Sequence, residues 1–125
     1  MKRIGFIGLG IMGSNIAYHL LEKYKNINII KRNSVNTKNF LKKFANKGKI
    51  NLFENYKKLA ENSELIISCV GNDNDLKDIY LKKNKILDGV KKNSIIVDHT
   101  TASLNISIKL FKKFKNKNAF FLMHL

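Results

Sequence analysis

Three glycines near the amino terminus, Gly8, Gly10 and Gly13, have the spacing G-x-G-x-x-G. They follow a short apolar stretch and precede an amphipathic one, so a strand is expected before the turn and a helix after it. In that context the first glycine permits a tight turn, the second lets a pyrophosphate approach the backbone, and the third allows close packing of helix on strand. The predicted dinucleotide contacts are Gly8, Leu9, Gly10, Ile11, Met12 and Gly13.

The bound group would be an anion, because backbone N–H groups and the helix N-terminus face it. The alternative is a glycine-rich turn with no ligand, and the strand-turn-helix context favours a dinucleotide over it. A mononucleotide P-loop is excluded, since no Lys-Ser or Lys-Thr pair follows the glycines.

The second strand is expected to end at Lys31, followed by Arg32 and Asn33. A unit that binds NAD usually has an Asp or Glu about 20 residues after the glycines, where it accepts hydrogen bonds from the ribose. No acidic residue occurs from position 23 to position 53. A carboxylate there would repel a 2′-phosphate, whereas Lys31 and Arg32 attract it. The sequence therefore predicts NADP(H) rather than NAD(H), although Lys31 could equally be one more surface lysine.

Two further segments are expected at the carboxyl ends of strands, where open α/β sheets bind ligands. Val70-Gly71-Asn72-Asp73 follows the fourth strand, and the segment 98–103 follows the fifth. Hydroxyls and amides there could line the ribose and nicotinamide. For Thr101 and Ser103, capping of the next helix is an equally good explanation. Asp98 is expected to be structural, and Asp73 is expected to cap a helix.

The remaining candidates for chemistry are weaker. His19, His99 and His124 lie on separate predicted elements without recurrent ligand spacing, so no metal site is expected. His99 could act in acid–base chemistry, but no second group is evident beside it. Cys69 falls in an apolar strand and is interpreted as a core residue rather than a nucleophile. No catalytic residue is assigned.

The elements that would position these residues alternate along the chain. The alternation predicts a parallel sheet of about six strands with right-handed crossovers, a doubly wound α/β (Rossmann) fold in a single domain. Helical periodicity predicts that Leu104, Ile108 and Phe111 form one apolar stripe of the last helix. The expected strands are 3–7, 28–31, 49–53, 64–70, 94–98 and 119–122, and the expected helices are 12–24, 36–46, 56–61, one beginning at 73, and 103–114.

Composition is consistent with one folded domain. The chain has 125 residues, 44% of them hydrophobic and 26% charged, which argues against disorder. The net charge of +15 raises the alternative of a basic nucleic-acid-binding protein. However, 22 of the basic residues are Lys spread along the chain and 2 are Arg, which favours solvated surface charge. No apolar stretch reaches membrane-spanning length, and the chain is interpreted as cytoplasmic.

Three ordered segments resemble the β-hydroxyacid dehydrogenases, the group of 3-hydroxyisobutyrate dehydrogenase and the semialdehyde reductases. They are 7–21, which contains the glycine turn, 68–73 (Ser-Cys-Val-Gly-Asn-Asp) and 97–103 (Val-Asp-His-Thr-Thr-Ala-Ser). The resemblance extends from residue 2 to about residue 122. It implies an NAD(P)-dependent oxidation of a β-hydroxyacid, or the reverse reduction of a semialdehyde.

The resemblance also implies roles for single residues. Arg32 matches the arginine of the Asn-Arg-Thr segment of members that prefer NADP, and Lys31 departs from that segment. Val70 and Gly71 fall where the family often has Leu-Pro along the cofactor. Thr101 matches a threonine near the nicotinamide. His99 is a tolerated variant and gains no catalytic role.

The last residues, 123–125, depart from the family pattern. There the family continues with a substrate-binding segment and a helical C-terminal domain that carries the catalytic Lys. The expectation is therefore that residues 1–125 are an NADP-binding Rossmann domain, truncated and inactive alone. A small hydroxyacid or semialdehyde would be a partner only if the helical domain were supplied. The alternative is a non-catalytic module that binds or senses NADP(H).

Overall fold

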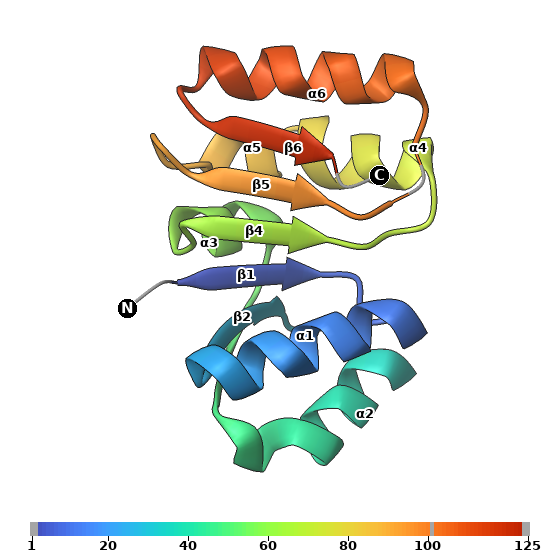
Figure 1. The fold of residues 1–125 in the computed structure, drawn as a ribbon, viewed down its shortest axis with the longest axis vertical. Helices are drawn as coiled ribbons and strands as arrows, with labels where there is room; N and C mark the ends of the chain where they lie inside the picture. The colour runs from blue at the N-terminus through green and yellow to red at the C-terminus, as the bar shows by residue number, and fades with distance from the viewer. Residues whose placement is uncertain (1–2, 101, 124–125) are drawn as a thin grey trace.

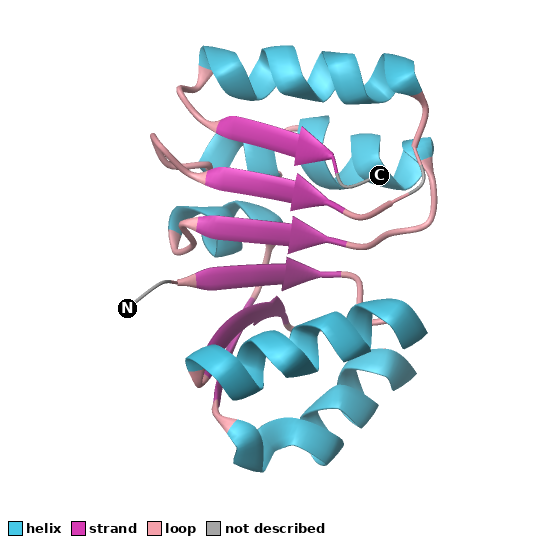
Figure 2. Ribbon diagram, viewed as in Figure 1, coloured by secondary structure: helices cyan, strands magenta, loops and turns pink. Residues whose placement is uncertain are grey.

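The computed structural model describes residues 3–100 and 102–123, which form six strands and their connecting helices (Figures 1 and 2). The strands are β1 (Ile4–Ile7), β2 (Asn26–Ile30), β3 (Lys49–Phe53), β4 (Leu65–Ser68), β5 (Ile95–Asp98) and β6 (Phe120–Met123). The helices are α1 (Ile11–Tyr24), α2 (Val35–Phe44), α3 (Tyr56–Glu61), α4 (Asp73–Leu76), α5 (Ile86–Gly89) and α6 (Leu104–Asn116), with a 3-10 turn η1 (Ala45–Lys47) and a π-helical segment η2 (Lys77–Leu81).

The six strands make one parallel sheet in the order β3-β2-β1-β4-β5-β6. The chain therefore builds outward from β1 through β2 and β3, and then crosses back to place β4 on the other side of β1. All carboxyl ends lie along one edge of the sheet, and the direction of winding reverses between β1 and β4. This arrangement confirms the predicted doubly wound sheet, and its switch point is where such sheets bind ligands.

Apolar side chains of successive strand residues alternate between the two faces of the sheet. Phe6 packs with α1 and α2 residues such as Leu21 and Phe40 on one face. The adjacent Ile7 joins Leu59 and Leu110 in a second cluster on the other face, which α3, η2, α5 and α6 cover. Strands buried on both faces read as continuous apolar runs, which is why β1 and β4 were detectable in the sequence.

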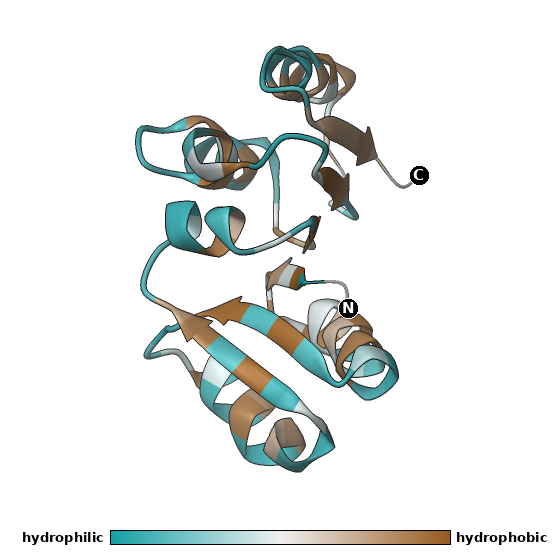
Figure 3. Cartoon of the chain, turned by 90° about the vertical axis from the view of Figure 1, so that its left-hand side faces the viewer, coloured by the Kyte–Doolittle hydropathy of each residue, from teal (hydrophilic) through white to brown (hydrophobic). Residues whose placement is uncertain are grey.

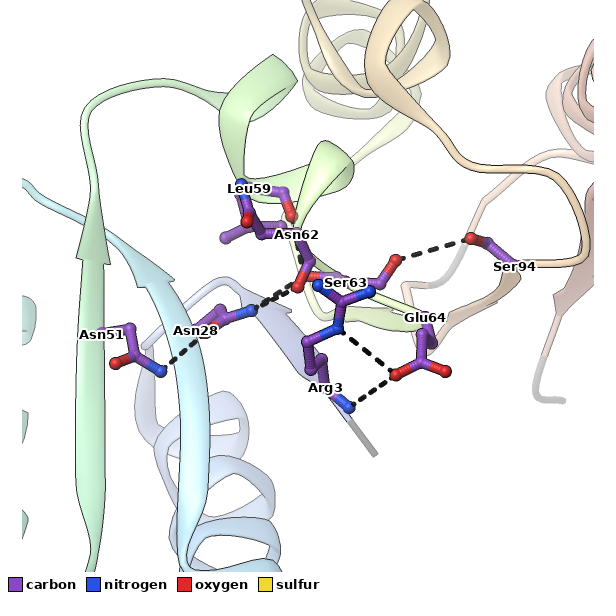
Figure 4. A network of polar contacts seen from close by, with 8 residues as sticks. All are labelled: Arg3, Asn28, Asn51, Leu59, Asn62, Ser63, Glu64 and Ser94. Carbon is purple, nitrogen blue, oxygen red and sulfur yellow. Dashed lines mark hydrogen bonds and ion pairs between the residues drawn. The ribbon is translucent and has the colours of Figure 1, made fainter. Parts of the chain in front are cut away.

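A polar network ties the strands together near their amino ends (Figure 4). Asn28 is buried, and its Nδ2 donates to Ser63 Oγ at 3.1 Å, while Asn51 Nδ2 donates to Asn28 Oδ1 at 2.9 Å. At the start of β1, the Arg3 backbone N–H and Nε contact Glu64 Oε1 at 3.2 and 3.4 Å. These contacts, the backbone N–H first, lower the pKa of the Glu64 carboxyl. Arg3 therefore has a structural partner at the edge opposite the carboxyl ends.

Part of one sheet face carries exposed apolar side chains. Ile95 on β5 and Phe120 and Leu122 on β6 are 39%, 58% and 54% exposed. In Figure 1, α1 lies in front of β2 with α2 below it, while no helix lies between the viewer and β5 or β6. We call these three side chains the apolar edge. It is unusual, because parallel sheets are normally covered on both faces.

Helix α6 turns a different side inward from the one that the periodicity indicated. The stripe of Leu104, Ile108 and Phe111 is exposed, and the helix instead packs on the sheet through Ile106, Ser107, Leu110 and Phe114. Both sets recur at helical spacing, so the sequence pattern alone did not distinguish them. No helix among the described residues is long and apolar enough to cross a membrane.

Two local predictions in the region after β4 were wrong. Asn72, not Asp73, caps α4, and its side-chain oxygen accepts the Asp75 backbone N–H at 3.0 Å. Helix α5 was not predicted, because its four residues lie between lysine-rich segments and are too few for a periodic signal. The other predicted strands and helices agree with the structure to within a few residues at their ends.

Candidate functional site

The turn from β1 to α1 requires glycine at its first position. Gly8 has φ of +102°, and a Cβ built there would lie 2.1 Å from the carbonyl oxygen of Cys69. Cys69 in turn donates its backbone N–H to Ile7 at 2.9 Å, so β4 is fixed against the turn. A side chain at position 8 would therefore meet backbone that cannot move aside.

Gly13 is required for a different contact. It lies buried in the first turn of α1, and a Cβ there would be 1.7 Å from the carbonyl oxygen of Gly8. The helix can approach the end of β1 this closely only without a side chain at position 13. This close approach directs the α1 N-terminus at the space beyond β1.

The second glycine has no such steric role. Gly10 is exposed at the N-cap of α1, and a Cβ built there has nothing within 4 Å. Ile11 and Met12 beside it are 93% and 64% exposed, and the first turn of α1 contains no acidic residue. The positive end of the helix dipole is thus open and not neutralised from within. Ser14 Oγ donates to the Leu9 carbonyl at 2.9 Å and holds the turn.

The end of β2 presents two cations with different surroundings. Lys31, Arg32 and Asn33 are all exposed. The Lys31 ammonium lies 3.7 Å from Glu54 Oε1, at the end of the adjacent β3. Arg32 makes no ion pair in the part of the chain that the structure describes. Its guanidinium therefore remains available to an anionic ligand.

Arg32 borders two hollows at the carboxyl edge. One extends over the ends of β1 and β2 and is lined by Gly8, Ile30, Ser34 and Thr37, among others. The other lies toward β4, where Val70 and Ile79 line it. Tyr56 borders both hollows. The position suits a nucleoside that extends from the glycine turn toward β2.

Sequence reasoning missed several residues of these hollows. Ser34 caps α2, with its Oγ accepting the Thr37 N–H at 3.2 Å, and its cap position was a detectable signal. Tyr56 and Ile79 come from distant segments, and nothing in their local sequence indicated a place in the site. Lys85 Nζ lies 4.9 Å from the centre of the Tyr56 ring. Glu54 lies one residue beyond the acid-free segment, and only the pairing of β2 with β3 brings it to Lys31.

The loop after β4 is held by the loop after β5. The Val70 backbone N–H donates to Thr100 Oγ1 at 2.9 Å. Gly71 is exposed, and a Cβ there would meet only the Asp75 carboxylate, at 2.6 Å. Thr101 lies outside the described residues. Val70 and Gly71 therefore reach the same edge as the glycine turn, and Val70 and Arg32 line one hollow there from opposite sides of β1.

Asp73 connects the two loops instead of capping α4. Its carboxylate accepts the Ser103 backbone N–H at 2.9 Å and the Ser103 hydroxyl at 2.5 Å. These bonds, that of the hydroxyl first, lower the pKa of Asp73. Ser103 also caps α6, with its Oγ accepting the Ile106 N–H at 3.3 Å. The capping explanation for Ser103 thus has a direct structural basis.

The other candidates for chemistry do not gather into a reactive cluster among the described residues, and His124 lies outside them. Cys69 is only partly buried, just past the end of β4, and burial followed by the charge of Asp98 raises the pKa of its thiol. A raised pKa disfavours the thiolate that nucleophilic chemistry needs. His19 is exposed on α1. Within residues 3–100 and 102–123, no three His, Cys, Asp or Glu side chains cluster as metal ligands would.

Comparison with known families and sequences gives a consistent result. Residues 3–124 match the sequence profile of the NAD binding domain of 6-phosphogluconate dehydrogenase. An uncharacterized oxidoreductase of Shewanella frigidimarina is 30% identical over 122 residues, which is 98% of this chain and 40% of the relative. The mitochondrial 3-hydroxyisobutyrate dehydrogenase of Drosophila melanogaster is 29% identical over 121 residues, 97% of this chain and 35% of the relative. The chain thus spans about two-fifths of these proteins.

Solved structures share the fold at low sequence identity. Psf3 in complex with NADP⁺ and 2-OPP superposes with a TM-score of 0.80 at 20% identity, covering 94% of this chain and 40% of that one. The 3-hydroxyisobutyrate dehydrogenase of Salmonella typhimurium superposes with a TM-score of 0.80 at 16% identity, covering 97% of this chain and 40% of that one. An imine reductase variant from Myxococcus stipitatus in complex with NAD⁺ superposes with a TM-score of 0.79 at 15% identity, covering 98% of this chain and 40% of that one.

Proposed function

Because the chain belongs to the family of the NAD binding domain of 6-phosphogluconate dehydrogenase, we propose that it binds NADP(H) along the carboxyl edge of its sheet. The pyrophosphate would lie on Gly8–Gly13 at the open N-terminus of α1. The adenosine would extend toward Arg32, and the nicotinamide half toward Val70, Gly71 and Thr101. The observation that carries the choice of NADP over NAD is Arg32 at the end of β2, which forms no ion pair with any described residue.

Electrostatics support this choice. A 2′-phosphate at the end of β2 would meet the Arg32 guanidinium, which can bind phosphate through two parallel hydrogen bonds. Three carboxylates lie on this side of the edge. Glu54 is 3.7 Å from the Lys31 ammonium and Asp78 is 2.7 Å from that of Lys82, while Asp75 lines the hollow toward β4 together with Arg32. A ribose that lacks the phosphate would leave the guanidinium without a partner of opposite charge.

We expect the chain to bind NADPH at least about tenfold more tightly than NADH, because a charged hydrogen-bonded pair with phosphate contributes roughly 1.5–3 kcal/mol. Isothermal titration of both reduced cofactors in one buffer measures the ratio. Competition by 2′,5′-ADP, but not by 5′-AMP, would place the discrimination at the 2′-phosphate. Equal or tighter binding of NADH would contradict the assignment.

For a full-length protein of which this domain is a part, we propose hydride transfer between NADP(H) and a β-hydroxyacid or its semialdehyde. By itself, the 125-residue chain is expected to bind the cofactor without measurable turnover. The physical reason is that hydride transfer to a carbonyl needs a positioned proton donor, a contribution of typically 10²–10⁴-fold, and no described residue is assigned that role. Oxidation of NADPH with a semialdehyde, followed at 340 nm, checks this, and turnover above background would place the catalytic groups within this chain.

A further inference from the structure

A chain of hydrogen bonds runs beneath the carboxyl edge, under the loops that follow β4 and β5. The Tyr80 hydroxyl donates to Ser68 Oγ at 2.7 Å, and Ser68 Oγ donates to Asp98 Oδ1 at 2.7 Å. Thr100 Oγ1 donates to the same Asp98 oxygen at 2.7 Å. The end of the chain is the Val70 backbone N–H, which donates to Thr100 Oγ1 at 2.9 Å. We call these four side chains, Ser68, Tyr80, Asp98 and Thr100, the buried relay.

The buried relay is closed to water. Ser68, Tyr80 and Asp98 are 0% exposed and Thr100 is 4% exposed. Asp98 Oδ2 has no hydrogen-bond partner among residues 3–100 and 102–123. Within that part of the chain, the two hydroxyls that donate to Oδ1 therefore offset the burial of this carboxylate. Apolar side chains of similar volume would fill such a site at no greater cost in stability. The polar arrangement therefore fixes a geometry rather than adding to the stability of the core.

An unusual backbone conformation positions Tyr80 for its hydrogen bond to Ser68. Tyr80 belongs to the π-helical segment η2, which follows directly on α4. Such segments are rare and occur frequently at functional sites. Edge-on contacts with Phe114 and Phe121, at 5.6 and 6.2 Å between ring centres, fix the ring. Burial raises the pKa of the Tyr80 phenol, so it remains a protonated donor at neutral pH.

The group that the relay holds is the Val70 amide, at the start of the loop after β4. Since Arg32 and β2 would receive the adenosine, the other half of a dinucleotide crosses β4 and β5. We propose that Asp98, acting through Thr100 and supported by Ser68 and Tyr80, is a positioning residue that holds the Val70–Gly71 loop for the nicotinamide half of the cofactor. This proposal rests on the proposed function.

The test compares binding of the whole cofactor with binding of its adenosine half alone. Thr100→Val keeps the shape of the side chain but removes the hydroxyl, and Thr100→Ser is the matched control that retains it. In the full 125-residue chain, we expect Thr100→Val to raise the Kd for NADPH about five- to tenfold, as loss of one such hydrogen bond implies. The Kd for 2′,5′-ADP, which lacks the nicotinamide half, should stay within about twofold. Thr100→Ser should bind both as the wild type does.

Tyr80→Phe provides a second variant whose residue lies in η2, outside both loops. It should weaken NADPH about two- to threefold and leave 2′,5′-ADP unchanged, with folding checked by thermal denaturation. Equal losses for both ligands, or unchanged NADPH binding in folded Thr100→Val and Tyr80→Phe, would overturn the positioning role. A wild-type chain that binds neither ligand would overturn the proposed function, and this proposal with it.

Discussion

An alanine at position 10 is expected to weaken NADPH binding by more than about 100-fold, or ~2.7 kcal/mol, while the domain stays folded. The exposed Gly10 backbone is where the pyrophosphate would approach, and a methyl group there would hold it off. Nothing in the protein lies within 4 Å of that methyl position. Any loss of NADPH affinity in Gly10→Ala must therefore come from contact between the added methyl group and the bound cofactor, not from a clash within the protein. Its effect on the free energy of unfolding should stay within about 1 kcal/mol.

The matched comparison is Gly13→Ala, three residues away in the same motif. Its methyl group would lie 1.7 Å from the Gly8 carbonyl oxygen, so α1 would have to move away from β1. We expect a loss of roughly 2–4 kcal/mol in folding stability and a melting temperature lower by about 10 °C. Thermal denaturation followed by circular dichroism, paired with titration of NADPH, distinguishes the two variants. Strong NADPH binding by Gly10→Ala would exclude the glycine turn as the pyrophosphate site.

Replacing Arg32 by alanine should have the second-largest effect, and one specific to the phosphorylated cofactor. Loss of a charge-assisted hydrogen bond to phosphate costs about 1.5–3 kcal/mol, so the Kd for NADPH should rise roughly 10- to 150-fold. The Kd for NADH, which has no 2′-phosphate, should change little. Parallel titrations of the two cofactors measure the change in their ratio.

Arg3→Ala is the control for charge alone. It removes the same side chain and the same unit of charge, but at the opposite edge, where Arg3 contacts Glu64 at 3.4 Å. This exposed pair contributes little to stability, and its loss should leave NADPH binding unchanged. Lys31→Ala should have a smaller effect than Arg32→Ala, because Glu54 already partners Lys31. If Arg3→Ala and Arg32→Ala weakened NADPH equally, general attraction by the basic surface would explain the binding instead.

The sheet was predictable because its strands are short and carry a regular pattern: β1 and β4 are mainly apolar runs, while β2 and β3 alternate apolar residues with Asn or Lys, seen as alternating bands in Figure 3. The runs around Ile66 and Ile96 have lengths that fit buried parallel strands, and the glycines mark the first crossover. The glycine turn itself was predictable because its spacing is a recognisable motif and Gly13 meets a local steric demand, the carbonyl oxygen of Gly8. The demand at Gly8 is not local, since a side chain there would meet Cys69 in the segment after β4. Contacts between residues that are close in the sequence can be recognised from a short segment alone.

What could not be predicted depends on contacts between distant segments. The buried relay joins Ser68 to Asp98 across 30 positions, and each residue looks ordinary in its own segment. The π-helical geometry of η2 has no recognised sequence signal, and the sequence predicted only a helix that begins at residue 73. The inward side of α6 was ambiguous because Ile108 and Leu110 belong to two competing stripes. Only tertiary packing decides among such alternatives.

The apolar edge makes the behaviour of this domain in solution depend on ionic strength. At low salt, the net charge of +15 keeps molecules apart by mutual repulsion. At about 0.1 M salt the screening length falls to about 10 Å, and short-range attraction between exposed strands begins to dominate. Phe120 and Leu122 on the outermost strand would then favour reversible clustering of the chains. Dilute buffer is therefore expected both to keep the chains apart and to strengthen the attraction of Lys31 and Arg32 for phosphate.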